Sequence, residues 1–240
     1  MTAPLPHIPV IHSSWKAPLV GEIKYKAFMV SQSHPLIMIA DSEDATPQER
    51  IEAIEKCVND CLVSDHKAEE LPSFILEALW IKIRAISVSD ILNIRYRCKA
   101  KDEDGNECDN PIPMSFDLTD MTIKGELDDK VDIGSGYGVQ IKWPSLSMVK
   151  ELADMASNDP TAVLKVLLKN VYNEEDVWEF SEYTDEALTD WIGNLAIGVK
   201  AEIIGKLTEL PYISLRAEAE CGKCGKSHSV ELKSLHEAFM

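Results

Sequence analysis

Six cysteines are the residues of this 240-residue chain whose type and spacing could support chemistry. Cys221 and Cys224 are separated by two residues, and Gly225 follows directly. This spacing favours a tight turn in which backbone amides point toward the sulfur atoms, as they do in structural zinc sites. A tetrahedral zinc ion needs four ligands, so the turn accounts for only half of a site.

A second pair of cysteines, Cys98 and Cys108, could supply the remaining ligands. Asp104 and Gly105 between them predict a hairpin turn, and the flanking residues alternate between apolar and polar types. The separation is longer than zinc-binding pairs usually show. A hairpin compensates for it, because residues that face each other across paired strands lie close together. The predicted structural zinc site therefore has the ligands Cys98, Cys108, Cys221 and Cys224.

Other interpretations of these thiols stay open at this point. Cys221 and Cys224 could form a redox-active dithiol, although no strand–helix–strand pattern surrounds them. His228 could replace one cysteine as a metal ligand, or the four thiols could bind no metal. Cys57 and Cys61 lie at helical spacing on an apolar stripe, and we interpret them as core residues.

Composition and charge narrow the class of protein. Hydrophobic residues make up 45% and charged residues 27% of the chain, which is typical of a folded protein and not of a disordered one. Acidic residues outnumber basic ones by 41 to 24, giving a net charge of -17. Such a field repels nucleic acid, so we expect no nucleic-acid partner. We also expect no membrane segment and no secretory signal, hence a cytoplasmic setting with reduced thiols.

The acidic residues are unevenly distributed. Residues 171–199 contain eight Asp or Glu and no Lys or Arg. A solvated helix face would explain this pattern. The alternative is that residues 174–190 dock a basic partner, with Trp178 and Trp191 as aromatic anchors.

Motifs for catalysis are missing from the sequence. There is no phosphate-binding glycine loop, no dinucleotide-binding fingerprint, no nucleophile elbow and no pair of zinc-binding histidines at helical spacing. The six histidines are scattered without an acid or a nucleophile at a suitable distance along the chain. We therefore expect the protein not to be an enzyme.

The spacing of apolar residues predicts the elements that would position the cysteines. Helices are expected from Thr46 to Leu62 and over residues 71–87, and strands are expected around both cysteine pairs. The predicted fold class is α+β, with helical bundle portions packed with a small, zinc-ribbon-like β-rich unit built from the two cysteine-containing hairpins. The expected segments are an extended N-terminal arm (1–20), a strand plus helices (21–90), the zinc-binding unit (91–143 and 212–240) and an acidic helical segment (144–211).

The order of these features resembles the baseplate hub proteins of T-even-type contractile-tailed phages. The resemblance covers the chain from Gly21 onward and is strongest at the C-terminal cysteine turn. It depends on the segments GEIKYKAFMV, SVSDILNIRYRC, CDNPIPMSFDL, ALTDWIGNL and EAECGKCGKSHSVELKSLHEAF. The family often has a closer cysteine pair where this chain has Cys98 and Cys108.

The resemblance implies a non-enzymatic protein that acts in baseplate hub assembly, as a chaperone or as a hub component, through contacts with other hub proteins. It implies a location in the host cytoplasm during assembly, and in the tail baseplate if the protein stays in the virion. The first alternative is a permanent structural subunit of the baseplate. A less favoured alternative is a zinc- or thiol-dependent enzyme. The sequence does not indicate an oligomeric state.

Overall fold

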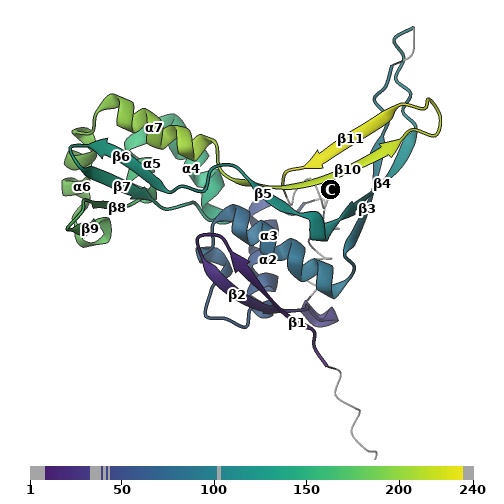
Figure 1. Ribbon diagram of the computed structural model, residues 1–240, viewed down its shortest axis with the longest axis horizontal. Coiled ribbons are helices and arrows are strands. Elements are labelled where there is room, and N and C mark those ends of the chain that lie inside the picture. Colours follow the sequence, from purple (N-terminus) through teal and green to yellow (C-terminus); the bar gives the residue numbers. More distant parts are fainter. Residues whose placement is uncertain (1–8, 33–38, 40–41, 43, 102–103, 235–240) are drawn as a thin grey trace, which may run out of the picture. The chain divides into compact units, whose positions relative to one another are not determined.

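The computed structural model describes residues 9–32, 39, 42, 44–101 and 104–234, and the chain divides into two compact units. Unit 1 comprises residues 1–68, 77–123 and 212–240, and it contains all six cysteines. Unit 2 comprises residues 69–76 and 124–211. Figure 1 shows the order of the elements along the chain.

Unit 1 begins with an antiparallel hairpin of β1 (His12–Ala17) and β2 (Gly21–Lys26). Ile23 and Tyr25 of β2 are buried. The backbone of β2 also accepts a hydrogen bond of 2.8 Å from the amide of Val63. The hairpin is thereby tied to the segment that follows the first long helix.

This hairpin corrects the extended arm expected over residues 1–20. Residues 12–17 pair along their whole length with β2, because the prolines of this region lie on either side of the strand and leave its amides free to donate. Residues 1–8 lie outside the described residues.

Two helices follow, α2 (Pro47–Cys61) and α3 (Ser73–Ser87), with the short 3-10 helix η1 (Ala68–Glu70) between them. Helix α2 begins where the sequence predicts. The Thr46 hydroxyl accepts from the Glu49 amide at 3.2 Å, and the Glu49 carboxylate accepts from the Thr46 amide at 2.8 Å, which is a capping box.

Helix α3 is apolar nearly all round, and its burial matches that composition. Its fully buried side chains include Phe74, Ile75, Leu76, Leu79, Ile81 and Ile83. In the described part of the chain, no helix is both long enough and apolar enough to cross a membrane.

The two cysteine-containing hairpins form in unit 1 as the sequence predicts. Strand β3 (Ile91–Arg97) pairs with β4 (Pro111–Asp117), and β10 (Tyr212–Glu220) pairs with β11 (Ser227–Leu232), both antiparallel. The 3-10 helix η2 (Leu118–Asp120) follows β4, and β5 (Thr122–Lys124) lies on the other side of β10 from β11. Strand β10 packs against β4, so the two hairpins lie side by side (Figure 1).

Unit 2 is built on an antiparallel sheet in the order β6-β7-β8-β9. Its strands are β6 (Lys130–Gly134), β7 (Tyr137–Ile141), β8 (Leu168–Tyr172) and β9 (Val177–Glu179), and the 3-10 helix η3 (Phe180–Glu182) follows. Its helices are α4 (Leu146–Asn158), α5 (Pro160–Leu167), α6 (Asp185–Gly193) and α7 (Ile197–Thr208). Leu152 of α4 and Leu167 of α5 belong to one buried apolar cluster. The mixture of helices and sheets is consistent with the predicted α+β class.

The structure corrects two details of the predicted acidic helical segment. The helix that opens at Pro160 ends at Leu167, and residues 168–172 form β8, in which Val171 pairs with Val139 of β7. The stretch from 174 to 190 is also not one helix, since it contains β9 and η3 before α6 begins. Pairing with a neighbouring strand outweighs the helical spacing of a few apolar residues.

The unit boundaries also differ from the expected segments because strand pairing decides which unit a segment joins. Residues 124–143 were expected with the cysteine hairpins, but β6 pairs with β7 and β7 pairs with β8, so both strands belong to unit 2. Most of the expected strand-plus-helix segment, residues 21–90, lies in the same unit as the cysteine hairpins.

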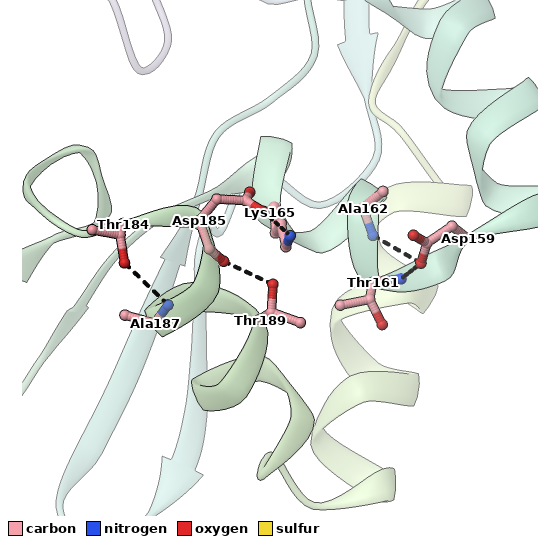
Figure 2. Close-up of polar contacts among 8 residues, drawn as sticks. All are labelled: Asp159, Thr161, Ala162, Lys165, Thr184, Asp185, Ala187 and Thr189. Carbon is pink, nitrogen blue, oxygen red and sulfur yellow. Dashed lines mark hydrogen bonds and ion pairs between the residues drawn. The ribbon is translucent and has the colours of Figure 1, made fainter.

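In unit 2, side chains cap the first turns of α5 and α6, and an ion pair joins the last turn of α5 to the first turn of α6 (Figure 2). Asp159 caps α5 by accepting from two backbone amides, and the Thr184 hydroxyl caps α6 by accepting from the Ala187 amide. Between the helices, the Lys165 ammonium lies 2.7 Å from the Asp185 carboxylate. The start of α6 is therefore fixed both locally and to its neighbour.

Candidate metal centre

The two hairpins of unit 1 bring four thiols to one place. Cys98 follows β3 and Cys108 precedes β4, while Cys221 follows β10 and Cys224 lies in the turn before β11. Their four sulfur atoms all lie within 4.8 Å of one another. Sequence reasoning selected these same residues, and the structure places all of them together.

The distances between the sulfur atoms match a tetrahedral thiolate site. Cys98 Sγ lies 3.7 Å from Cys224 Sγ, and Cys108 Sγ lies 3.9 Å from Cys221 Sγ. Four sulfurs that are each about 2.3 Å from a central zinc ion would be about 3.8 Å apart. A disulfide needs about 2.05 Å, so the thiols are free and are arranged as ligands would be.

Backbone pairing in the first hairpin explains how two distant cysteines meet. The Cys98 amide donates to the Asn110 carbonyl at 2.9 Å, and the Cys108 amide donates to the Ala100 carbonyl at 2.8 Å. The loop beyond them is closed by a bridge between Lys101 and Glu107. The long separation in sequence thus becomes a short one across the ladder.

The second pair is held by a tight turn. The Cys221 amide donates to the Lys226 carbonyl at 2.9 Å, and the Gly225 amide donates back to the Cys221 carbonyl at 2.8 Å. Gly225 has φ +69°, a left-handed conformation that glycine adopts without strain. This is the cysteine turn that the spacing predicts.

The surroundings shift the pKa values of the Cys221 and Cys98 thiols in opposite directions. The backbone amide of Cys224, followed by that of Lys223, lowers the pKa of the Cys221 thiol to about 6. Burial raises the pKa of the Cys98 thiol to about 12, and hydrogen bonds with the other three thiols act in the same direction. Four thiolates this close repel one another, whereas a divalent cation at their centre would stabilise all four in the ionised form.

His228 lies beside the thiols. Its Nε2 is 3.2 Å from Cys98 Sγ, and its ring packs against Tyr96 with centroids 5.6 Å apart. The group of ligand atoms that lie mutually within 4.8 Å consists of the four sulfurs and does not include this ring nitrogen. His228 therefore lies within hydrogen-bond distance of Cys98 but outside the cluster of four sulfur atoms found among the described residues.

Three further residues support the site and were missed by sequence reasoning. Asn110 Nδ2 donates to Cys221 Sγ at 3.6 Å, Lys223 Nζ donates to the Cys108 carbonyl at 3.3 Å and Lys226 Nζ donates to the Lys101 carbonyl at 3.2 Å. Each of these bonds joins one hairpin to the other. Their partners lie more than a hundred residues away in sequence, so no local pattern indicates them.

Cys57 and Cys61 lie elsewhere, on the buried face of α2. They are separate from the candidate metal-binding group among the described residues. Their burial agrees with the interpretation that they are core residues.

Comparison with known proteins identifies a family for this chain. A family model described as "T4 bacteriophage base plate protein" matches residues 8–240, which is nearly the whole chain. No curated protein and no solved structure matches.

Proposed function

Because the chain belongs to the T4 bacteriophage base plate protein family, we propose that it acts in the assembly of the baseplate hub as a non-enzymatic protein that binds other hub proteins. The family model is the observation that carries this proposal, since it extends over residues 8–240 and therefore covers both units. Membership in the family gives the chain a structural or assembly role in the phage baseplate. The hub is the narrower part of the proposal, and the resemblance of the cysteine-rich C-terminal segment to hub proteins supports it.

We further propose that the four cysteines hold one structural zinc ion. Sulfur-only coordination fits zinc, and the separations of 3.7 and 3.9 Å fit its bond lengths. The two hairpins are far apart in sequence, so a shared metal would cross-link them within unit 1. Binding energy of such an ion is also folding energy, because the site does not exist in the unfolded chain.

Zinc in this site would have no catalytic role. Catalytic zinc sites keep one position open for water or substrate, whereas four thiolates fill all positions of a tetrahedron. A zinc-dependent enzyme would need three protein ligands and an open position, and a redox dithiol would need thiols without a metal. The placement of four sulfurs within 4.8 Å of one another favours the structural role.

The proposed partners are proteins. The net charge of -17 opposes binding to nucleic acid and favours partners with basic surfaces. The proposed location is the host cytoplasm while the hub is being built. A second candidate is a permanent baseplate subunit, which the same family match supports.

An affinity-tagged full-length chain expressed during infection is expected to recover baseplate hub proteins above a tag-only control. Recovery should fall as salt is raised, because charge on an acidic protein contributes to these contacts and salt screens it. Quantitative mass spectrometry of the eluates measures both effects. Recovery of no baseplate protein above the control, from soluble and folded bait, would count against the proposal.

A further inference from the structure

Unit 2 contains a hollow of about 560 Å³ whose wall is largely aromatic. Its aromatic side chains come from β7, β9, η3 and α6 and from the turn between the last two. We refer to this set as the aromatic hollow: Tyr137, Trp178, Phe180, Tyr183 and Trp191. This size is typical of sites that take a small molecule or one or two large side chains.

Contacts among its own rings and the anchoring of α6 hold the aromatic hollow in shape. Trp178 lies beside Tyr137 with ring centroids 6.1 Å apart, and Trp191 meets Phe180 edge to face, with ring centroids 5.1 Å apart and an interplanar angle of 68°. Helix α6 is capped by Thr184 and tied to α5 by the ion pair of Asp185 (Figure 2). A preformed site of this kind costs little conformational entropy on binding.

Part of this apolar wall remains in contact with solvent. Tyr137 is 42% exposed and Tyr183 is 46% exposed. Large aromatic side chains grouped around a hollow are the typical anchors of binding hot spots. The wall therefore has the composition of a docking site rather than of a core that is fully closed.

The segment 171–199, which supplies most of the residues lining the hollow, carries acidic residues and no Lys or Arg. Of the eight acids between 171 and 199, Glu179 accepts a hydrogen bond from Asn170 at 3.0 Å and Asp185 pairs with Lys165. The other six are exposed, and within the described residues no ion pair involves them. Each is within three residues, along the chain, of a side chain that lines the hollow; we call them the acidic set: Glu174, Glu175, Asp176, Glu182, Glu186 and Asp190.

We infer that the aromatic hollow and the acidic set form one docking site for a segment of another baseplate protein in which Lys or Arg residues flank a large apolar side chain. The apolar side chain enters the hollow, and the cations meet the uncompensated carboxylates and the faces of the aromatic rings. This inference rests on the proposed function, because it takes the partner from the same assembly.

The N-terminal segment of a second copy is a poorer occupant. Residues 1–20 contain apolar side chains but only one Lys and no Arg, so they offer little charge to the acidic set. Charge complementarity therefore selects a basic segment of a different protein.

The test uses the full-length protein and overlapping synthetic peptides that cover the other baseplate proteins of the same phage, with a peptide of residues 1–20 of this chain included. Peptides that bind are expected to carry net positive charge and a large apolar residue. They should also change tryptophan fluorescence, because Trp178 and Trp191 line the hollow. Binding only by neutral or acidic peptides, or strongest binding by the peptide of residues 1–20, would overturn the inference.

Two variants connect binding to this surface without disturbing the core. Ala187 is exposed and lines the hollow, so Ala187→Arg should fill the hollow and repel a basic peptide, weakening binding about tenfold or more, while Ala187→Ser should change little. Binding that survives Ala187→Arg would overturn the inference.

Charge reversal in the acidic set tests peptide binding independently of the Ala187 variants. Glu174→Lys, Glu175→Lys and Glu182→Lys combined should weaken binding most at low salt. The matched control changes net charge equally at exposed acids of unit 1, through Glu52→Lys, Asp65→Lys and Asp120→Lys, and should bind nearly as the wild type does.

The same variants separate this inference from the proposed function. If the tagged Ala187→Arg protein still recovers hub proteins from infected cells, the assembly role stands and this docking site is wrong. If the tagged wild-type protein recovers none, the proposed function itself fails.

Discussion

Cys224→Ser is expected to remove the metal and to lower the melting temperature by on the order of 10 °C. Cys224 is the exposed member of the four cysteines, so its replacement by serine removes almost no packing. Surface substitutions of this kind usually change the free energy of unfolding by less than about 0.5 kcal/mol. A large loss of stability at this exposed position would therefore report the loss of a metal ligand.

Elemental analysis of the purified wild-type protein should find about one zinc ion per chain, and the Cys224→Ser protein should contain much less. Chelation of the wild-type metal should lower the melting temperature toward that of the variant. Wild-type protein that is prepared without chelators and contains no metal would contradict the zinc assignment.

The control for this experiment is the double variant Cys57→Ala and Cys61→Ala. Both residues are buried in α2 and separate from the four thiols, so zinc content should stay unchanged. Their removal should cost only packing, ~1–2 kcal/mol in all. Loss of metal from this variant would show that the wrong cysteines were grouped.

A phage whose gene for this chain carries an early stop codon is expected to produce no infectious progeny. If the chain acts in hub assembly, its absence stops the pathway before the tail tube and sheath polymerise. Cells infected with this mutant should therefore accumulate heads without tails, which electron microscopy of lysates and plaque counts can measure.

Complementation separates the role of the metal site from that of the other cysteines. The wild-type gene and the Cys57→Ala, Cys61→Ala gene supplied from a plasmid should both restore plaques, whereas the Cys224→Ser gene should restore far fewer. Normal tails in the stop-codon mutant would contradict an essential assembly role.

The cysteine cluster could be predicted from the sequence because its determinants are local. Hairpin alternation and the turn at Gly105 bring Cys98 near Cys108, and the spacing of Cys221 and Cys224 defines a tight turn on its own. The convergence of the two pairs followed from the four ligands that a tetrahedral zinc ion needs, since each pair supplies only two. The position of His228 beside Cys98 depends on how the hairpins pack, so the sequence left its role open.

The fold of unit 2 was harder to predict, because its sheet joins two short hairpins that α4 and α5 separate in the sequence. Val171 lies at helical spacing from Leu167 and Leu164, yet it pairs across strands with Val139 and Trp178. Val139 lies far outside any local window, and short apolar runs fit a strand and a helix equally well. The aromatic hollow was missed for the same reason, although its two tryptophans had been selected from the acidic segment.

Quantitative mass spectrometry of purified tails beside baseplate assembly intermediates tests the central claim most directly. If this chain acts in building the hub, it should be present, together with hub proteins, in intermediates that precede the tube and sheath. Its amount in finished tails then separates a chaperone, which leaves, from a subunit, which stays. Absence of the chain from every intermediate and from finished tails, while it is abundant in the infected cell, would contradict the account.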